Sequence, residues 1–99
     1  MSYTTEGMFG IAGEVALVIG AAGCLGREVS HALSELGAKV ALCDLREDSI
    51  RALERELRAA GREAAAFDAD VTSKAQMRQM ADAVATRFGR IDILVNCAG

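Results

Sequence analysis

The sequence predicts an α/β fold of the βαβαβαβ type, with a parallel four-stranded sheet in the order 3-2-1-4. Two observations predict this fold. Four short apolar runs alternate with three longer segments in which apolar residues recur every three or four positions. Such regular alternation of strand and helix indicates parallel strands joined by right-handed crossovers. The arrangement amounts to one half of a doubly wound fold.

The first strand is predicted at residues 14–20, where EVALVIG is an apolar, β-branched run typical of a buried parallel strand. A helix follows it and is expected to stop at Gly37, because glycine is the usual residue just beyond a helix end. The apolar stripe of this helix is predicted to contain Leu25, Val29, Leu33 and Leu36.

The second strand is predicted at residues 39–44, KVALCD. The next helix ends near Gly61, and Glu54 and Arg58 stand four residues apart on its polar side. That spacing predicts an exposed ion pair within the helix. The apolar stripe consists of Ile50, Leu53, Leu57 and Ala60.

The third strand is predicted at residues 63–71, although its alanines are poor strand formers. Ser73 and Gln76 fit a capping box at the start of the third helix, which ends at Gly89. The fourth strand is predicted at residues 91–96, IDILVN. The stripe of the third helix consists of Met77, Met80, Ala81, Val84 and Phe88.

Composition limits the function classes that this chain can serve. Residues 1–10 are expected to form an arm and residues 11–99 one domain. With 52% apolar and 25% charged residues the chain can build a core, and its net charge of −3 argues against binding to nucleic acid or to an anionic membrane. No apolar stretch approaches the roughly 20 residues that cross a bilayer, and no secretory signal pattern opens the chain. Three cysteines without metal-site spacing predict no metal and reduced thiols, so we expect a cytoplasmic protein.

A glycine-rich loop, VIGAAGCLG, joins the first strand to the first helix. The expected strand order reverses between strands 1 and 4, and ligands of doubly wound sheets bind at the carboxyl ends of the strands there. Gly20 would permit the sharp exit from the strand, Gly23 a close backbone approach to a diphosphate, and Gly26 close packing of the helix. The helix N-terminus would add unpaired N–H groups. Glycines placed for purely steric reasons remain the alternative.

Asp44 closes the second predicted strand, roughly 20 residues after the glycine loop, where dinucleotide-binding Rossmann folds place an acidic residue on the ribose. A carboxylate there repels a 2′-phosphate, which favours NAD over NADP. Arg46 is a counter-indication, because a guanidinium can accommodate that phosphate. A helix N-cap is the alternative role for Asp44.

Four motifs between Phe9 and Gly99 occur in an order that resembles one family, the short-chain dehydrogenases/reductases. Three residues depart from the usual pattern: Ile19 stands for threonine, Cys24 for glycine and Cys97 for asparagine. The spacing of the loop glycines is similar to that of the family's extended branch, whereas the Asn-Cys-Ala-Gly ending favours its single-domain oxidoreductase branch. The motifs are GEVALVIGAAGCLG, VALCDL, DADVT and FGRIDILVNCAG.

The resemblance implies a set of cofactor-binding residues. Asp44 would bind the ribose hydroxyls, and Asp70 would meet the adenine amino group, with the Val71 backbone beside it. The end of the fourth strand would line the central ribose side, and the glycine loop would hold the diphosphate mostly through backbone groups. The full set is Gly20, Ala22, Gly23, Leu25, Gly26, Asp44, Asp70, Val71, Asn96, Ala98 and Gly99.

The resemblance also implies catalytic residues that these 99 residues do not contain. Family members use a serine and a Tyr-x-x-x-Lys pair, with the tyrosine as general acid/base for hydride transfer between nicotinamide and a carbonyl or secondary alcohol. The only tyrosine here is Tyr3, with Gly7 where the lysine would stand. We therefore expect a truncated chain that binds NAD without turning over by itself. A non-catalytic nucleotide-binding or interaction module, or a gene product without independent function, is the alternative.

The expected topology leaves part of the sheet uncovered. The first two helices should cover one face, and the third helix alone should cover the other. The fourth strand, residues 91–96, is then an open edge next to an exposed apolar patch. A complementing chain or a second copy of this chain would fit that edge and face.

Overall fold

The computed structural model describes residues 10–98 of the chain. The expected N-terminal arm lies outside the described residues except for Gly10, and Gly99 also lies outside them. In the described part, no helix is both long enough and apolar enough to cross a membrane.

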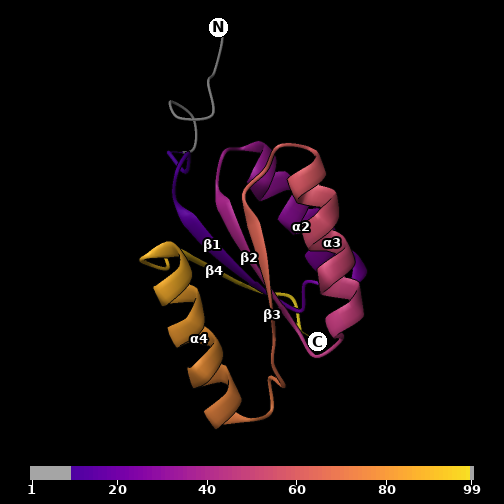
Figure 1. Ribbon diagram of the computed structural model, residues 1–99, viewed down its shortest axis with the longest axis vertical. Helices are drawn as coiled ribbons and strands as arrows, with labels where there is room; N and C mark the ends of the chain where they lie inside the picture. The colour runs from indigo at the N-terminus through magenta and orange to yellow at the C-terminus, as the bar shows by residue number, and fades with distance from the viewer. Residues whose placement is uncertain (1–9, 99) are drawn as a thin grey trace, which may run out of the picture.

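Four parallel strands form one sheet in the order β3-β2-β1-β4, which confirms the predicted fold class and strand order (Figure 1). Every crossover contains one helix, as the alternating sequence pattern predicts. Because β1 lies between β2 and β4, the strand order reverses beside β1. The elements are β1 (Val15–Ile19), α2 (Cys24–Glu35), β2 (Lys39–Asp44), α3 (Glu47–Ala59), β3 (Ala64–Asp68), α4 (Lys74–Phe88) and β4 (Ile93–Asn96).

Helices α2 and α3 cover one face of the sheet and α4 covers the other, as expected (Figure 1). Alternate residues of β1 and β2 point to opposite faces, so each face has its own core. Under α2 and α3 the core includes Val18, Val40, Leu42, Ile50, Leu53 and Leu57. Under α4 it includes Val15, Leu17, Ile19, Cys43, Met80 and Val84.

Strand β4 is less well covered than the others. Leu94 is paired in register with the buried Leu17 and lies on the α4 side of the sheet, yet it is 63% exposed. Helix α4 contacts β3 and β2 more extensively than β4. The sheet therefore presents apolar side chains beside its β4 edge.

Three predicted strands are shorter in the structure. The first prediction ran over residues 14–20, and β1 covers Val15–Ile19. The third prediction ran over residues 63–71, but β3 ends at Asp68 because the chain turns there. The Asp70 side chain accepts a hydrogen bond from the Thr72 N–H, which closes that turn. The fourth prediction ran over residues 91–96, and β4 begins at Ile93.

Four side-chain predictions were wrong in detail. Ala60 does not belong to the buried stripe of α3, because it is the C-cap of the helix and is exposed. Leu25 does not belong to the buried stripe of its helix, because it lies in the first turn and is 65% exposed. The Ser73 hydroxyl accepts from the Gln76 N–H as predicted, but the Gln76 side chain accepts from the Asp70 N–H and does not complete the capping box. Glu54 and Arg58 do not pair with each other, because each binds the backbone of β3.

Candidate nucleotide-binding site

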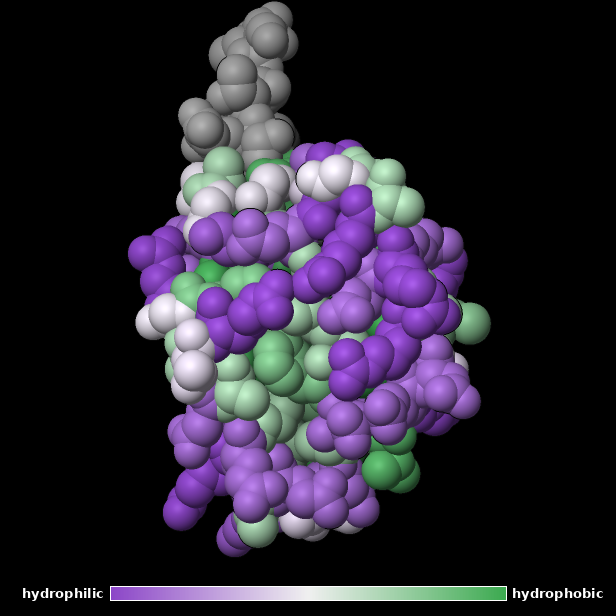
Figure 2. Space-filling view, viewed as in Figure 1, coloured by the Kyte–Doolittle hydropathy of each residue, from purple (hydrophilic) through white to green (hydrophobic). Residues whose placement is uncertain are grey.

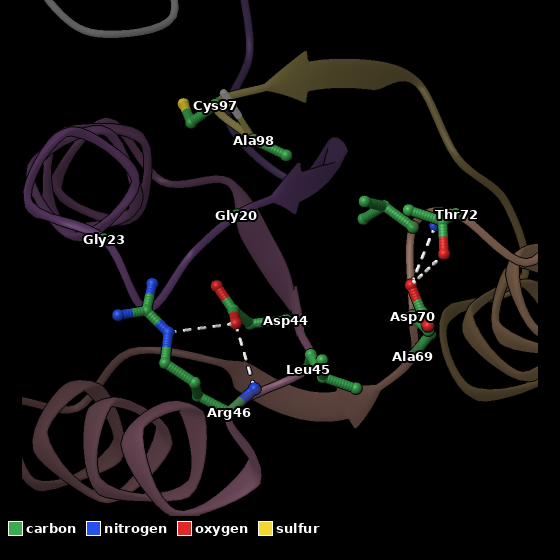
Figure 3. A pocket seen from close by; sticks show the side chains of 11 residues that line it. Gly20, Gly23, Asp44, Leu45, Arg46, Ala69, Asp70, Thr72, Cys97 and Ala98 are labelled. Atoms are coloured by element: carbon green, nitrogen blue, oxygen red, sulfur yellow. Dashed lines mark hydrogen bonds and ion pairs between the residues drawn. The ribbon is translucent and has the colours of Figure 1, made fainter.

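A cavity of about 390 Å³ opens at the carboxyl ends of the strands, where the strand order reverses (Figure 3). Its walls come from the segments that follow all four strands, which are separate in the sequence. The lining residues are Gly20, Gly23, Asp44, Leu45, Arg46, Ala69, Asp70, Val71, Thr72, Cys97 and Ala98.

The structure brings part of the predicted set together in this cavity. Ala22, Leu25, Gly26 and Asn96 do not line it, and Gly99 lies outside the described residues. The predicted residues that do line the cavity are Gly20, Gly23, Asp44, Asp70, Val71 and Ala98.

Two glycines of the loop are required by packing. Gly20 has a φ of +81°, and a Cβ there would lie 2.6 Å from the Ala98 nitrogen. A Cβ on Gly26 would collide with the Gly20 carbonyl oxygen and lie 2.8 Å from the Ala21 Cα. These contacts account for the sharp exit from β1 and the close approach of α2 to the sheet.

Gly23 is different, because packing does not require a glycine at this position. Its φ is −77°, and a Cβ there would be in ordinary contact with the Gly20 oxygen at 3.6 Å and with Arg46 Nη2 at 3.7 Å. Gly23 lines the cavity, so the missing side chain leaves room for a ligand between the loop and Arg46. The steric explanation of the loop thus covers Gly20 and Gly26 but not Gly23.

Helix α2 begins beside this space with free backbone donors. Gly23 is its N-cap and provides no side-chain cap, and the Gly23 carbonyl accepts the first helical hydrogen bond from the Arg27 N–H at 2.9 Å. The N–H groups of residues 24–26 have no acceptor within the helix. Together with the helix dipole they favour an anion at this end.

Asp44 connects the end of β2 to both neighbouring segments. Its Oδ2 accepts from the Ala22 N–H at 3.1 Å, and its Oδ1 accepts from the Arg46 N–H at 2.9 Å. The residue is only 7% exposed. Burial alone would raise the pKa of the Asp44 carboxyl, but hydrogen bonds from Arg46 and Ala22 outweigh burial and hold the pKa below its usual value. The N-cap of α3 is Arg46, so the alternative role of Asp44 as that N-cap was wrong.

The guanidinium of Arg46 lies over this carboxylate (Figure 3). Arg46 Nε is 3.3 Å from Asp44 Oδ1, while the Arg46 side chain remains 61% exposed. The same guanidinium stands opposite Gly23. One wall of the cavity therefore carries a carboxylate and an exposed cation side by side.

Asp70 and Thr72 form the facing wall. Asp70 Oδ1 accepts from the Thr72 N–H at 2.9 Å and from the Thr72 hydroxyl at 2.7 Å, and these bonds lower the pKa of the Asp70 carboxyl. Val71 and Leu45 also line the cavity, and both are exposed apolar side chains. The cavity thus combines polar groups that can form hydrogen bonds with exposed apolar side chains that can pack against a planar ring.

The end of β4 is held against β1. The Cys97 N–H donates to the Ile19 carbonyl at 2.7 Å, and Asn96 Oδ1 accepts from the Ala98 N–H at 3.0 Å. Asn96 therefore shapes this turn, while Cys97 and Ala98 line the cavity. Sequence reasoning placed Asn96 in the site and left Cys97 out of it.

Leu45, Ala69 and Thr72 also line the cavity and were not predicted to do so; Arg46 lines it too, and was considered from the sequence only as a partner for a 2′-phosphate. Leu45 and Arg46 directly follow Asp44 at the end of β2. Because residues that follow the strands of a parallel sheet line its ligand site, their position in the sequence could have predicted this role. Thr72 was indicated by the Asp-x-Thr spacing, because an Asp side chain readily accepts from the N–H two residues later.

The two carboxylates of this cavity are ionised hydrogen-bond acceptors. Asp44 and Asp70 have lowered pKa values and stay ionised at neutral pH, so neither can donate a proton there. Among residues 10–98 no group of three or more His, Cys, Asp or Glu side chains could hold a metal ion.

Comparison with known proteins assigns the chain to a family. The family model described as short chain dehydrogenase matches residues 14–99. The chain is 39% identical over 98 residues to a short chain dehydrogenase/reductase of Colletotrichum higginsianum, covering 99% of this chain and 37% of the relative. It is 43% identical over 91 residues to D-threitol dehydrogenase of Mycolicibacterium smegmatis, covering 92% of this chain and 35% of the relative. The chain thus spans little more than a third of these relatives.

Solved structures agree with this assignment. A metagenomic short-chain oxidoreductase in complex with NADP superimposes with a TM-score of 0.84 at 38% identity, over 90% of this chain and 40% of its own. A short chain dehydrogenase/reductase of Burkholderia phymatum in complex with NAD superimposes with a TM-score of 0.84 at 36% identity, over 88% of this chain and 31% of its own. Structural neighbours therefore bind both nicotinamide dinucleotides. The sequence match, the sheet order and the glycine-loop geometry together show that this chain belongs to the short-chain dehydrogenase family.

Proposed function

We propose that this chain supplies the dinucleotide-binding part of an oxidoreductase that transfers hydride between a nicotinamide cofactor and a carbonyl or secondary alcohol. One observation carries the proposal. Packing does not require a glycine at position 23, and the space that Gly23 leaves open lies next to free N–H groups of α2. When bound, the cofactor supplies or accepts the hydride.

The residues of the cavity suit the parts of such a cofactor. Gly20, Ala22, Gly23, Leu25 and Gly26 belong to the loop and helix start that would hold the diphosphate, mostly through backbone groups. Asp44 would accept hydrogen bonds from the ribose, since its carboxylate stays ionised. The adenine would lie between Leu45 and Val71, near Asp70. Asn96, Ala98 and Gly99 would form the side toward the nicotinamide ribose.

We propose NAD as the preferred cofactor. The ionised Asp44 repels a 2′-phosphate, and its ion pair engages the Arg46 guanidinium that lines the cavity. Calorimetric titration with NADH and NADPH tests this preference. We expect tighter binding of NADH, and Asp44→Ser should narrow the difference because Arg46 is then freed for the phosphate. Equal binding of both cofactors by the unchanged chain would contradict the preference.

Turnover requires residues that these 99 residues do not contain. No Tyr-x-x-x-Lys pair occurs in the sequence, and the ionised carboxylates of the cavity cannot donate a proton to a carbonyl oxygen. We expect the chain to bind NADH without oxidising it in the presence of small ketones or aldehydes. Absence of NADH binding by a chain with folded circular dichroism would contradict the binding proposal, and enzyme-like NADH oxidation would contradict the catalytic one.

A second role, as an interaction module, has its own support. Leu94 and Ile91 are exposed beside the β4 edge, and apolar side chains at a sheet edge favour association. We propose that a complementing chain or a second copy covers this edge and face. Leu94→Glu should reduce any self-association that sedimentation detects, and an unchanged association constant would contradict the assignment to this face.

We also propose a cytoplasmic location for the protein, because its three cysteines are free thiols.

A further inference from the structure

The outer edge of β3 has a defined set of backbone groups that point away from the sheet. The Val40 N–H donates to the Glu63 carbonyl at 3.0 Å, and the Ala69 N–H donates to the Asp44 carbonyl at 3.2 Å. Because backbone groups alternate along a strand, the residues between these two anchors alternate between β2 and the free edge. Ala64 and Ala66 are among those that direct their backbone groups to the free edge.

Two side chains of α3 form hydrogen bonds with these backbone groups at the free edge. Glu54 Oε2 accepts from the Ala66 N–H at 2.8 Å, and Arg58 Nε donates to the Ala64 carbonyl at 2.9 Å. Four helical residues rise about 6 Å and two strand residues about 6.6 Å, so the spacing of Glu54 and Arg58 matches that of the two edge groups. We call these two side chains the edge clamp.

The strand has little other protection at this position. Residues 64–66 are three alanines, without the charge or proline that usually blunts an edge strand. Figure 2, viewed as in Figure 1, shows a hydrophobic strip down the middle of this face between hydrophilic side chains. Such a strip is open to another strand unless its hydrogen-bonding groups are already satisfied.

A second copy of the chain fits this edge by symmetry. If two β3 strands met antiparallel about a two-fold axis at Ala65, the Ala64 carbonyl of each copy would accept from the Ala66 N–H of the other. These are the same two groups that the edge clamp satisfies within one chain. We propose that Glu54 and Arg58 protect β3 against strand addition by a second copy.

The same helix offers a matched control. Glu47 and Arg51 also stand four residues apart, and they pair with each other at 3.7 Å, not with a strand. The double variant Glu54→Ala/Arg58→Ala and the control Glu47→Ala/Arg51→Ala remove the same charges from the same helix. Only the first of them exposes the edge groups of β3.

Sedimentation velocity across micromolar to millimolar concentrations tests the proposal, with circular dichroism to confirm folding. We expect the clamp variant to dimerise with a dissociation constant at least about tenfold lower than that of the unchanged chain, because its edge groups are no longer held by side chains and can exchange water for a partner strand. The control should sediment like the unchanged chain. Equal association of all three proteins would overturn the proposal.

Amide hydrogen exchange locates the new contact. At low concentration the Ala66 amide should exchange faster in the clamp variant than in the unchanged chain, and it should become protected as dimers form. Dimers without protection at residues 64–66 would overturn the proposal, because association would then use another surface such as the β4 edge. Should the double variant lose its helical signal, Glu54→Lys/Arg58→Glu takes its place, because lysine cannot accept from the Ala66 N–H and glutamate cannot donate to the Ala64 carbonyl. A monomeric chain with that pair of substitutions would likewise overturn the proposal. NADH binding is not part of the test, so its outcome is independent of the proposed function.

Discussion

Asp44 Oδ2 accepts a hydrogen bond from the Ala22 N–H at 3.1 Å, and this bond ties the end of β2 to the glycine loop. The other carboxylate oxygen, Oδ1, accepts from the N–H of Arg46, the residue directly before α3. One buried side chain thus fixes the relative position of two loops that form the cavity. A change at Asp44 should therefore affect both loop order and ligand binding.

Asp44→Asn should weaken NADH binding by about tenfold or more. The amide can accept only through one atom, so it leaves the N–H of either Ala22 or Arg46 facing another donor, and an unsatisfied buried donor costs about 1–3 kcal/mol. Calorimetric titration measures the loss. The control is Asp48→Asn in the exposed first turn of α3, which should bind NADH as the unchanged chain does.

Stability should fall in acid because of the same carboxylate. The pKa of Asp44 is lowered in the folded chain, as are those of Asp70, through the Thr72 hydrogen bonds, and Asp92, through the Val15 N–H. A lowered folded pKa stabilises the fold above the unfolded value of about 3.9, and this stabilisation is lost as pH falls through the folded pKa.

Urea unfolding at a series of pH values measures this loss. The free energy of unfolding should change little on this account between pH 7 and about pH 5, then decrease as the pH falls below about 4. Asp44→Asn should start from a lower stability and show a shallower decrease. An identical acid slope in both chains would contradict the role given to Asp44.

Gly23→Ala and Gly26→Ala should separate binding from folding. At Gly26 a Cβ meets the Gly20 carbonyl, so helix α2 must shift, at a cost of about 1–3 kcal/mol in the free energy of unfolding. At Gly23 a Cβ makes only ordinary contacts, so stability should change by less than about 1 kcal/mol.

NADH binding should be affected by Gly23→Ala even though stability is not. The methyl group that Gly23→Ala introduces would fill space between the loop and Arg46, and NADH affinity should fall by about tenfold while the unfolding curve stays near that of the unchanged chain. Calorimetry and urea unfolding on both variants give the two readouts. Unchanged NADH affinity in Gly23→Ala would show that the ligand does not approach this residue.

The three cysteines should report occupancy of the cavity. Cys97 lines it, Cys24 is exposed outside it, and Cys43 is buried with a pKa raised to about 11 by burial and by nearby Asp44 and Asp68. Iodoacetamide followed by peptide mass spectrometry should label Cys97 more slowly when NADH is present and leave Cys43 unlabelled in either case. NADH-independent labelling of Cys97 would place the cofactor elsewhere.

Sequence reasoning recovered the arrangement of elements because burial leaves a local record. The apolar runs at β1 and β2 and the helical stripe of α3 identify their elements without reference to distant residues. It failed where a side chain has both a local and a distant partner within reach. Glu54 and Arg58 have the spacing of a helical pair, yet each is hydrogen-bonded to a backbone group of β3 instead of to the other.

For the site, sequence alone determined which strand ends would meet and that Asp44 and the glycine loop would be among them. Only the tertiary structure decided what each residue does there: Gly26 is fixed by contact with Gly20, Gly23 leaves open space, and Arg46 covers Asp44. The physical reason is that periodicity encodes which face of an element is buried. The partner of a particular side chain depends on register and distance between segments that are far apart in the chain.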